Sequence, residues 1–156
     1  MQIQPYLFFE GRCEEAIAFY RQALDAEVVM LSRFGDMPPD ANDGGDAGGG
    51  DGQGCAGGGA PPPAEAVMHA ELRIGTSRLL LSDGFTAGQA EFKGVSLALS
   101  VADDAEAARR FEVLADGGKI EMPLGPSFFS TAFGVVRDRF GVSWMVVGPE
   151  SGAPPR

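Results

Sequence analysis

The same order of expected strands and helices occurs twice along this chain of 156 residues, and this repeat is the feature that most restricts its fold. Residues 1–34 together with 67–84 predict a strand, a helix and three further strands, and residues 92–148 predict the same order. One βαβββ unit leaves a face of its sheet bare, because its helix covers only the other face. The repeat therefore predicts an α+β fold, with two mixed sheets paired into a curved, cup-like cleft and the helices outside.

Apolar spacing and glycine positions define the expected elements. In the first half these are a strand over 4–9, a helix over 13–24 and strands over 26–34, 67–74 and 77–82. In the second half they are a strand over 95–101, a helix over 103–115 and strands over 119–124, 133–138 and 142–147. Apolar residues of both helices recur at steps of three and four, which indicates one buried stripe on each. Asp103 is the expected N-cap of the second helix, with Glu106 three residues further on.

Two segments lie outside the repeat. Half of the residues over 35–66 are Gly or Pro, and its six acidic residues occur without any Lys or Arg. Such a segment has little apolar surface to bury and a high entropic cost of ordering, so we expect a flexible insert. Its glycine run lacks the following helix and the Lys of a phosphate-binding loop. Residues 149–156 are expected to form a disordered tail.

Charge and hydropathy exclude several classes of partner. The net charge of −10 repels phosphate backbones, so we expect no nucleic-acid partner. No apolar run approaches the roughly 20 residues that span a bilayer, and the N-terminus lacks the pattern of a secretory signal. A membrane partner is therefore not expected, and the cytoplasm is the expected location. Cys13 and Cys55 are too few for a disulfide framework, and we expect both to be reduced thiols.

Four segments together resemble the vicinal oxygen chelate superfamily, which includes glyoxalase I, bleomycin-resistance proteins and extradiol dioxygenases. They are Gln4–Phe9, Cys13–Tyr20, Val67–Ala70 and Asp138–Met145. More narrowly, the chain resembles the PhnB-like branch, also labelled demethylubiquinone-methyltransferase-like. The segments come from both halves, so the resemblance covers nearly everything except the insert and the tail. It implies two βαβββ modules around one ligand cleft and a homodimer, whose second copy can complete the cleft.

The resemblance also implies where a metal ion would be held, namely by about four His, Glu or Gln side chains. These positions fall near Gln4 or Pro5, near Leu79–Leu81, near Val95 or Ser96 and near Met145. Gln4 is the usable donor among them, and Leu, Ser and Met do not replace imidazole and carboxylate for a hard or borderline ion. We therefore expect no metal and no other cofactor. A divalent ion stays an alternative that these positions do not support.

The candidate ligand-binding residues are Tyr6, Phe8, His69, Phe129 and Trp144. His69 is the one histidine of the chain. It is either an acid, base or hydrogen-bonding group of the cleft, or a partly buried histidine satisfied at a sheet surface. The aromatic side chains either stack on a planar ligand or fill the core or an interface. No catalytic residue follows from the sequence, because no partner of His69 has the spacing of a known triad.

Three functions are compatible with this pattern. The first is a metal-free protein that binds a small planar molecule, which we favour because the strands are rich in aromatic residues and lack a ligand quartet. The second is a metal-dependent enzyme of the superfamily, such as a glyoxalase-like isomerase, a dioxygenase or a transferase. This alternative depends on fold resemblance, which does not by itself establish function. The third is a regulatory protein that binds a partner chain.

Overall fold

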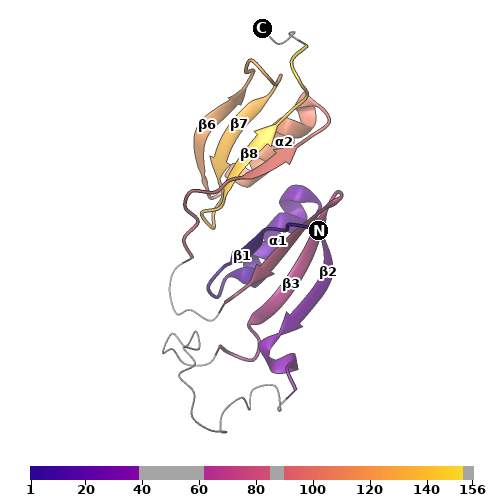
Figure 1. The fold of residues 1–156 in the computed structure, drawn as a ribbon. Helices are drawn as coiled ribbons and strands as arrows, with labels where there is room; N and C mark the ends of the chain where they lie inside the picture. The colour runs from indigo at the N-terminus through magenta and orange to yellow at the C-terminus, as the bar shows by residue number, and fades with distance from the viewer. Residues whose placement is uncertain (39–61, 85–89, 153–156) are drawn as a thin grey trace, which may run out of the picture. The chain divides into compact units, whose positions relative to one another are not determined.

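The computed structural model describes residues 1–38, 62–84 and 90–152 (Figure 1). The chain divides into two compact units, Met1–Gln89 and Ala90–Arg156. Within the described ranges, neither helix is long and apolar enough to cross a lipid bilayer. The cleft expected between the two sheets depends on how the units are placed relative to one another, and it stays a prediction.

The first unit contains β1 (Tyr6–Phe8), α1 (Cys13–Leu24), β2 (Glu27–Arg33), a short 3-10 helix (Phe34–Asp36), β3 (Val67–Ile74) and β4 (Ser77–Ser82). The strand order in its sheet is β1-β4-β3-β2, with β1 parallel to β4 and the other pairs antiparallel. The apolar stripe of α1 is buried. It supplies the core together with Leu7 of β1, Leu72 of β3 and Leu81 of β4.

The second unit contains β5 (Leu97–Ser100), α2 (Asp104–Ala115), β6 (Lys119–Gly125), β7 (Phe133–Arg137) and β8 (Ser143–Val147). Its strand order, β5-β8-β7-β6, repeats that of the first sheet, and β5 is parallel to β8. Both units are therefore βαβββ modules, which confirms the expected α+β class. The two opening strands are shorter than expected, because the pairing of β1 with β4 begins at Tyr6 and that of β5 with β8 at Leu97.

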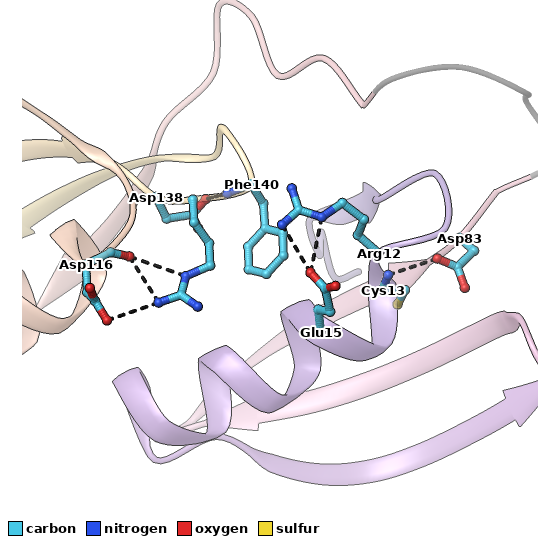
Figure 2. A network of polar contacts seen from close by, with 8 residues as sticks. Arg12, Cys13, Glu15, Asp83, Asp116, Asp138 and Phe140 are labelled. Atoms are coloured by element: carbon cyan, nitrogen blue, oxygen red, sulfur yellow. Dashed lines mark hydrogen bonds and ion pairs between the residues drawn. The ribbon is translucent and has the colours of Figure 1, made fainter.

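The two helices begin in different ways. Asp103 caps α2 as expected, since its carboxylate accepts a hydrogen bond from the backbone N–H of Glu106 at 2.7 Å. The residue that precedes α1 is Arg12, which provides no side-chain cap. Asp83, which follows β4, instead accepts a hydrogen bond from the N–H of Cys13 at 2.9 Å (Figure 2). Its other oxygen accepts the N–H of Val67 at 2.8 Å, so this buried carboxylate joins the starts of α1 and β3.

Arg33, at the end of β2, connects the two described ends of the expected insert. Its guanidinium donates to both carboxylate oxygens of Glu14 at 2.8 and 3.2 Å, and to the carbonyl of Glu65 at 2.6 Å. The backbone N–H groups of Phe34 and Gly35 donate to the carbonyls of Ala66 and Ala64. These contacts bring the two ends of the segment together, while residues 39–61 lie outside the described ranges.

The pair between Arg33 and Glu14 predicts a pH-dependent contribution to stability. The hydrogen bonds from Arg33, and then its charge, hold the pKa of Glu14 below its ordinary value. A lowered pKa means that the stabilisation is present above the unfolded pKa of about 4.3 and is lost as the pH falls. We expect Glu14→Gln to lower the melting temperature at about pH 7 and to converge with the wild type at about pH 3.

The matched control for this experiment is Glu15→Gln, because Glu15 lies in the same first turn of α1 and pairs with Arg12 instead. Both substitutions remove a negative charge near the helix N-terminus, where the dipole favours it. The difference between the two variants therefore compares the pair of Glu14 and Arg33 with the pair of Glu15 and Arg12, because the effect of the helix dipole is common to both. Equal effects for Glu14→Gln and Glu15→Gln at neutral pH would contradict the prediction.

The tail begins later than the sequence indicates. The expected disordered segment started at residue 149, but Pro149 accepts a backbone hydrogen bond from Thr131, and Ser151 donates one to Phe129. Two residues that follow β8 thus pair with the loop that precedes β7. Residues 153–156 of the expected tail lie outside the described ranges.

Candidate functional site

One face of the first sheet is turned away from α1 (Figure 1). The burial of neighbouring strand residues places three of the predicted site residues on this face. Successive side chains of a strand point to opposite faces. In β1, Leu7 is buried in the core, whereas Tyr6 and Phe8 are 39% and 49% exposed. In β3, Ala70 and Leu72 are buried, which places His69 on the opposite face with the two aromatic residues. We call this side of the sheet the open face.

The three side chains contact one another directly. The rings of Tyr6 and Phe8 stack, with centroids 5.0 Å apart and an angle of 22° between their planes. The phenol oxygen of Tyr6 lies 2.8 Å from Nδ1 of His69, and their ring centroids are 5.5 Å apart. The structure therefore brings together three residues that the sequence could propose only one at a time.

The register of the sheet explains how Tyr6 reaches His69. β4 lies between β1 and β3, and Tyr6 pairs with Leu80 while Phe8 pairs with Ser82. Neighbouring strands are about 4.8 Å apart, so a side chain on β1 must cross β4 to meet one on β3. The long phenol ring of Tyr6 spans this distance. This contact joins side chains of two strands that are not neighbours in the sheet.

The phenol of Tyr6 stays protonated around neutral pH. Burial raises the pKa of Tyr6 above its ordinary value, although a side-chain hydrogen bond with Ser82 acts in the opposite direction. A neutral phenol has one O–H to donate. Its oxygen lies within hydrogen-bond distance of Nδ1 of His69, and the direction of this hydrogen bond depends on the tautomer of the imidazole.

Charged side chains of the open face are paired with one another. Arg78 of β4 pairs with Glu71 of β3, and Arg73 of β3 pairs with Glu27 of β2. Two positive and two negative groups leave this part of the face without net charge. Alternation along β3 places Glu71 on the same face as His69. Its partner Arg78 is brought to it by the pairing register of β3 with β4.

Trp144 does not belong to the open face of any sheet. It is 4% exposed, and its indole N–H donates to the carboxylate of Asp138 at 2.9 Å. On β8 it alternates with Met145 and lies on the same side as the buried Val146. Trp144 is thus a core residue of the second unit, and we remove it from the candidate site.

Phe129 belongs to an aromatic cluster of the second unit. Its ring contacts those of Phe128 and Phe133, each at a centroid distance of 5.0 Å. Phe128 is 90% exposed and Phe129 41% exposed. This cluster lies in the second unit, whereas Tyr6, Phe8 and His69 lie in the first. A role for Phe129 in ligand binding stays a prediction.

Cys13 has no features of a nucleophile. It is buried in the stripe of α1, and it has no disulfide partner within the part of the chain that the structure describes. Burial, followed by the charges of Asp83 and Glu14, raises the pKa of its thiol far above the ordinary value. A thiol that stays protonated is a poor nucleophile and a poor metal ligand. Cys55 lies outside the described ranges.

The four positions at which a metal ion was considered do not form a ligand set. They fall near Gln4 or Pro5, near Leu79–Leu81, near Val95 or Ser96 and near Met145, and the hydroxyl of Ser96 is hydrogen-bonded to that of Ser143 at 2.7 Å. In the described ranges, no group of three His, Cys, Asp or Glu side chains lies close enough to hold an ion. One amide, one paired hydroxyl and one thioether do not match the oxygen and imidazole ligands that divalent ions prefer.

The chain is similar to known proteins over most of its length. Residues 2–146 match the family model of the Glyoxalase/Bleomycin resistance protein/Dioxygenase superfamily. The chain is similar to Protein YjdN of Escherichia coli (strain K12), with 38% identity over 146 residues that cover 94% of each protein.

Two solved structures are similar over almost the whole chain. The first is protein PA1353 from Pseudomonas aeruginosa, with 38% identity, a TM-score of 0.76 and coverage of 96% of this chain and 98% of that one. The second is the PhnB protein from Bacillus cereus, described as a putative 3-demethylubiquinone-9 3-methyltransferase. It is 29% identical, with a TM-score of 0.71 and coverage of 95% and 99%. The similarity therefore extends across both βαβββ units.

Proposed function

The chain belongs to the Glyoxalase/Bleomycin resistance protein/Dioxygenase superfamily, and from this premise we propose that it binds a small planar molecule on the open face of its first sheet without a metal ion. The matches also confirm the resemblance to the PhnB-like branch. Membership fixes the fold and leaves the chemistry to the residues of the site.

The single observation that carries the proposal is the stacked, half-exposed pair of Tyr6 and Phe8 beside His69. An aromatic pair offers a flat apolar surface on which a planar ring can stack, a contact worth about 0.5–1.5 kcal/mol beyond its buried area. His69 adds a directional hydrogen-bonding group at the edge of that surface. Apolar area with a few placed polar groups is the usual composition of a small-molecule site.

The absence of a matching ligand quartet separates this proposal from the metal-dependent alternative. The positions implied by the family carry Leu80, Ser96 and Met145. Their side chains do not supply the donor atoms that would hold a metal ion to act as a Lewis acid. Recognition through shape and stacking needs none of these donors.

The proposal is tested by screening planar aromatic fragments against the full chain with saturation-transfer difference NMR. For a fragment that binds, we expect Phe8→Ala to weaken affinity about tenfold, because the substitution removes half of the stacking surface. The control is Ile120→Ala, which removes an exposed apolar side chain from β6 of the other unit and should leave the affinity unchanged. Equal losses for the two variants would contradict the proposed site.

The metal-free part of the proposal has its own measurement. Elemental analysis of the purified protein should show no stoichiometric metal, and a chelator should leave fragment affinity unchanged. A thermal-shift series with Ni, Zn, Mn and Fe(II) should show no shift specific to one ion. One equivalent of tightly held ion, or a specific shift of several degrees, would instead favour a metal-dependent enzyme.

A further inference from the structure

Tyr6 contacts one particular nitrogen of His69, and this choice has a chemical consequence. A neutral imidazole carries its proton on either Nδ1 or Nε2, and the hydrogen bond made by one nitrogen decides which form is present. The Tyr6 oxygen lies 2.8 Å from Nδ1. A protonated phenol is the stronger donor of the two groups, and an unprotonated imidazole nitrogen is the stronger acceptor, so Tyr6 donates and Nδ1 accepts.

We propose that Tyr6 holds neutral His69 in the tautomer protonated at Nε2, so that the open face presents an N–H donor beside the stack of Tyr6 and Phe8. This inference rests on the proposed function and narrows its ligand class. The ligand is a planar conjugated molecule that carries an acceptor oxygen, as an aromatic ketone or amide does. Tyr6 then has two roles, because it stacks with Phe8 and positions His69.

The surroundings of His69 favour a neutral acceptor over an anion. Nδ1 is the ring nitrogen of His69 that has a hydrogen-bond partner among the residues the structure describes, which leaves Nε2 for a ligand. The guanidinium groups of the same face, Arg73 and Arg78, are each engaged by a glutamate. His69 therefore offers an uncharged N–H next to the aromatic stack, and this group takes part in no ion pair.

The tautomer is directly measurable, because His69 is the one histidine in the chain. Long-range proton–nitrogen correlation spectra of the labelled full-length protein at about pH 8.5, roughly two units above an ordinary histidine pKa, report each ring nitrogen. We expect an unprotonated Nδ1 and a protonated Nε2. In Tyr6→Phe the Nδ1 signal should lose its hydrogen-bond shift and move toward the average of the two tautomers.

The control for the spectra is Tyr20→Phe, which removes the hydroxyl of the other tyrosine, a buried residue of α1. It should leave both signals of His69 in place. A protonated Nδ1 in the wild type would overturn the proposal. So would a Tyr6→Phe spectrum identical to that of Tyr20→Phe.

The ligand class is tested with two probes of nearly the same shape, acetophenone and ethylbenzene, of which only the first has a carbonyl oxygen. Acetophenone should bind about twofold to tenfold more tightly, the value of one net hydrogen bond. His69→Phe keeps a ring but removes the N–H, so it should abolish this preference while ethylbenzene still binds. Ile120→Ala is again the control and should retain the preference.

The outcomes separate the tautomer from the proposed function. Equal affinity of the wild type for both probes would overturn the inferred ligand class. A preference for acetophenone that persists in His69→Phe would overturn the role of His69. If both probes fail to bind while the nitrogen signals are as expected, the result would count against the proposed function and the ligand class. It would not count against the contact between Tyr6 and His69.

Discussion

Asp138→Ala is expected to lower the free energy of unfolding of the second unit by roughly 3–5 kcal/mol, because it leaves several buried donors without an acceptor. Asp138 is 3% exposed and follows β7. One carboxylate oxygen accepts the backbone N–H groups of Phe140 and Val142 at 2.9 and 3.0 Å, and the other accepts the indole N–H of Trp144 at 2.9 Å. The substitution also opens a small void between the turn and the indole.

Asp138→Asn should fall between the wild type and the alanine variant. Its amide oxygen can replace the oxygen that serves the two backbone groups, but its NH₂ group then faces the indole N–H, so one donor loses its acceptor at about 1–3 kcal/mol. The control is Asp116→Ala. That carboxylate is 76% exposed and forms an ion pair with Arg139, so its removal should cost no more than about 1 kcal/mol.

Urea titration followed by tryptophan fluorescence measures this series, because Trp144 is the one tryptophan and lies beside the substituted group. The expected order of unfolding midpoints is wild type, Asp116→Ala, Asp138→Asn and then Asp138→Ala. An Asp138→Ala midpoint close to that of Asp116→Ala would show that water or a shifted turn replaces the carboxylate.

Element order was predictable from this sequence because local chemistry repeats in both halves. The apolar stripes of α1 and α2, the cap at Asp103 and the hairpin at Gly75 each act over a few residues. Gly75 adopts φ +58°, a left-handed conformation that glycine allows without strain. Such local patterns can be recognised in a single sequence, and they therefore predicted the βαβββ order.

Which face of a strand meets the helix was less predictable. β8 has apolar residues on both faces, with Trp144 and Val146 on one side and Met145 and Val147 on the other. Alternation groups these residues but does not say which group is covered. Trp144 was therefore proposed as a ligand contact although it packs in the core. β1 has the same ambiguity, and there Tyr6 and Phe8 do lie on the open side.

Contacts between segments that are far apart in the sequence were not predictable from the sequence alone. Asp83 directly follows β4 in the sequence, but its partners Cys13 and Val67 come from the starts of α1 and β3. The contact between Tyr6 and His69 likewise requires that β4 lie between their strands. Each residue could be named from the sequence, whereas its partner is a consequence of strand order and register.

Gly118→Ala is expected to destabilise the second unit by more than about 4 kcal/mol, which places it among the most damaging of single substitutions. Gly118 follows α2 and precedes β6. A Cβ at this position would lie 2.2 Å from the carbonyl oxygen of Arg137, and 2.9 and 3.0 Å from backbone carbons of Asp138. All of these are main-chain atoms, so no side chain can rotate away. The β6–β7 pair would have to separate by about 1 Å or more to reach ordinary contact distances.

The matched control is Gly125, the last residue of β6. A Cβ on Gly125 would meet no described atom within 4 Å, and its backbone is not in the left-handed region. Gly125→Ala should therefore be neutral or stabilising by up to about 1 kcal/mol, since alanine restricts the unfolded chain. Urea unfolding followed through Trp144 compares the two. Because the clash presses on the backbone that carries Asp138, a folded Gly118→Ala protein with the midpoint of Gly125→Ala would contradict the close approach of β6 and β7.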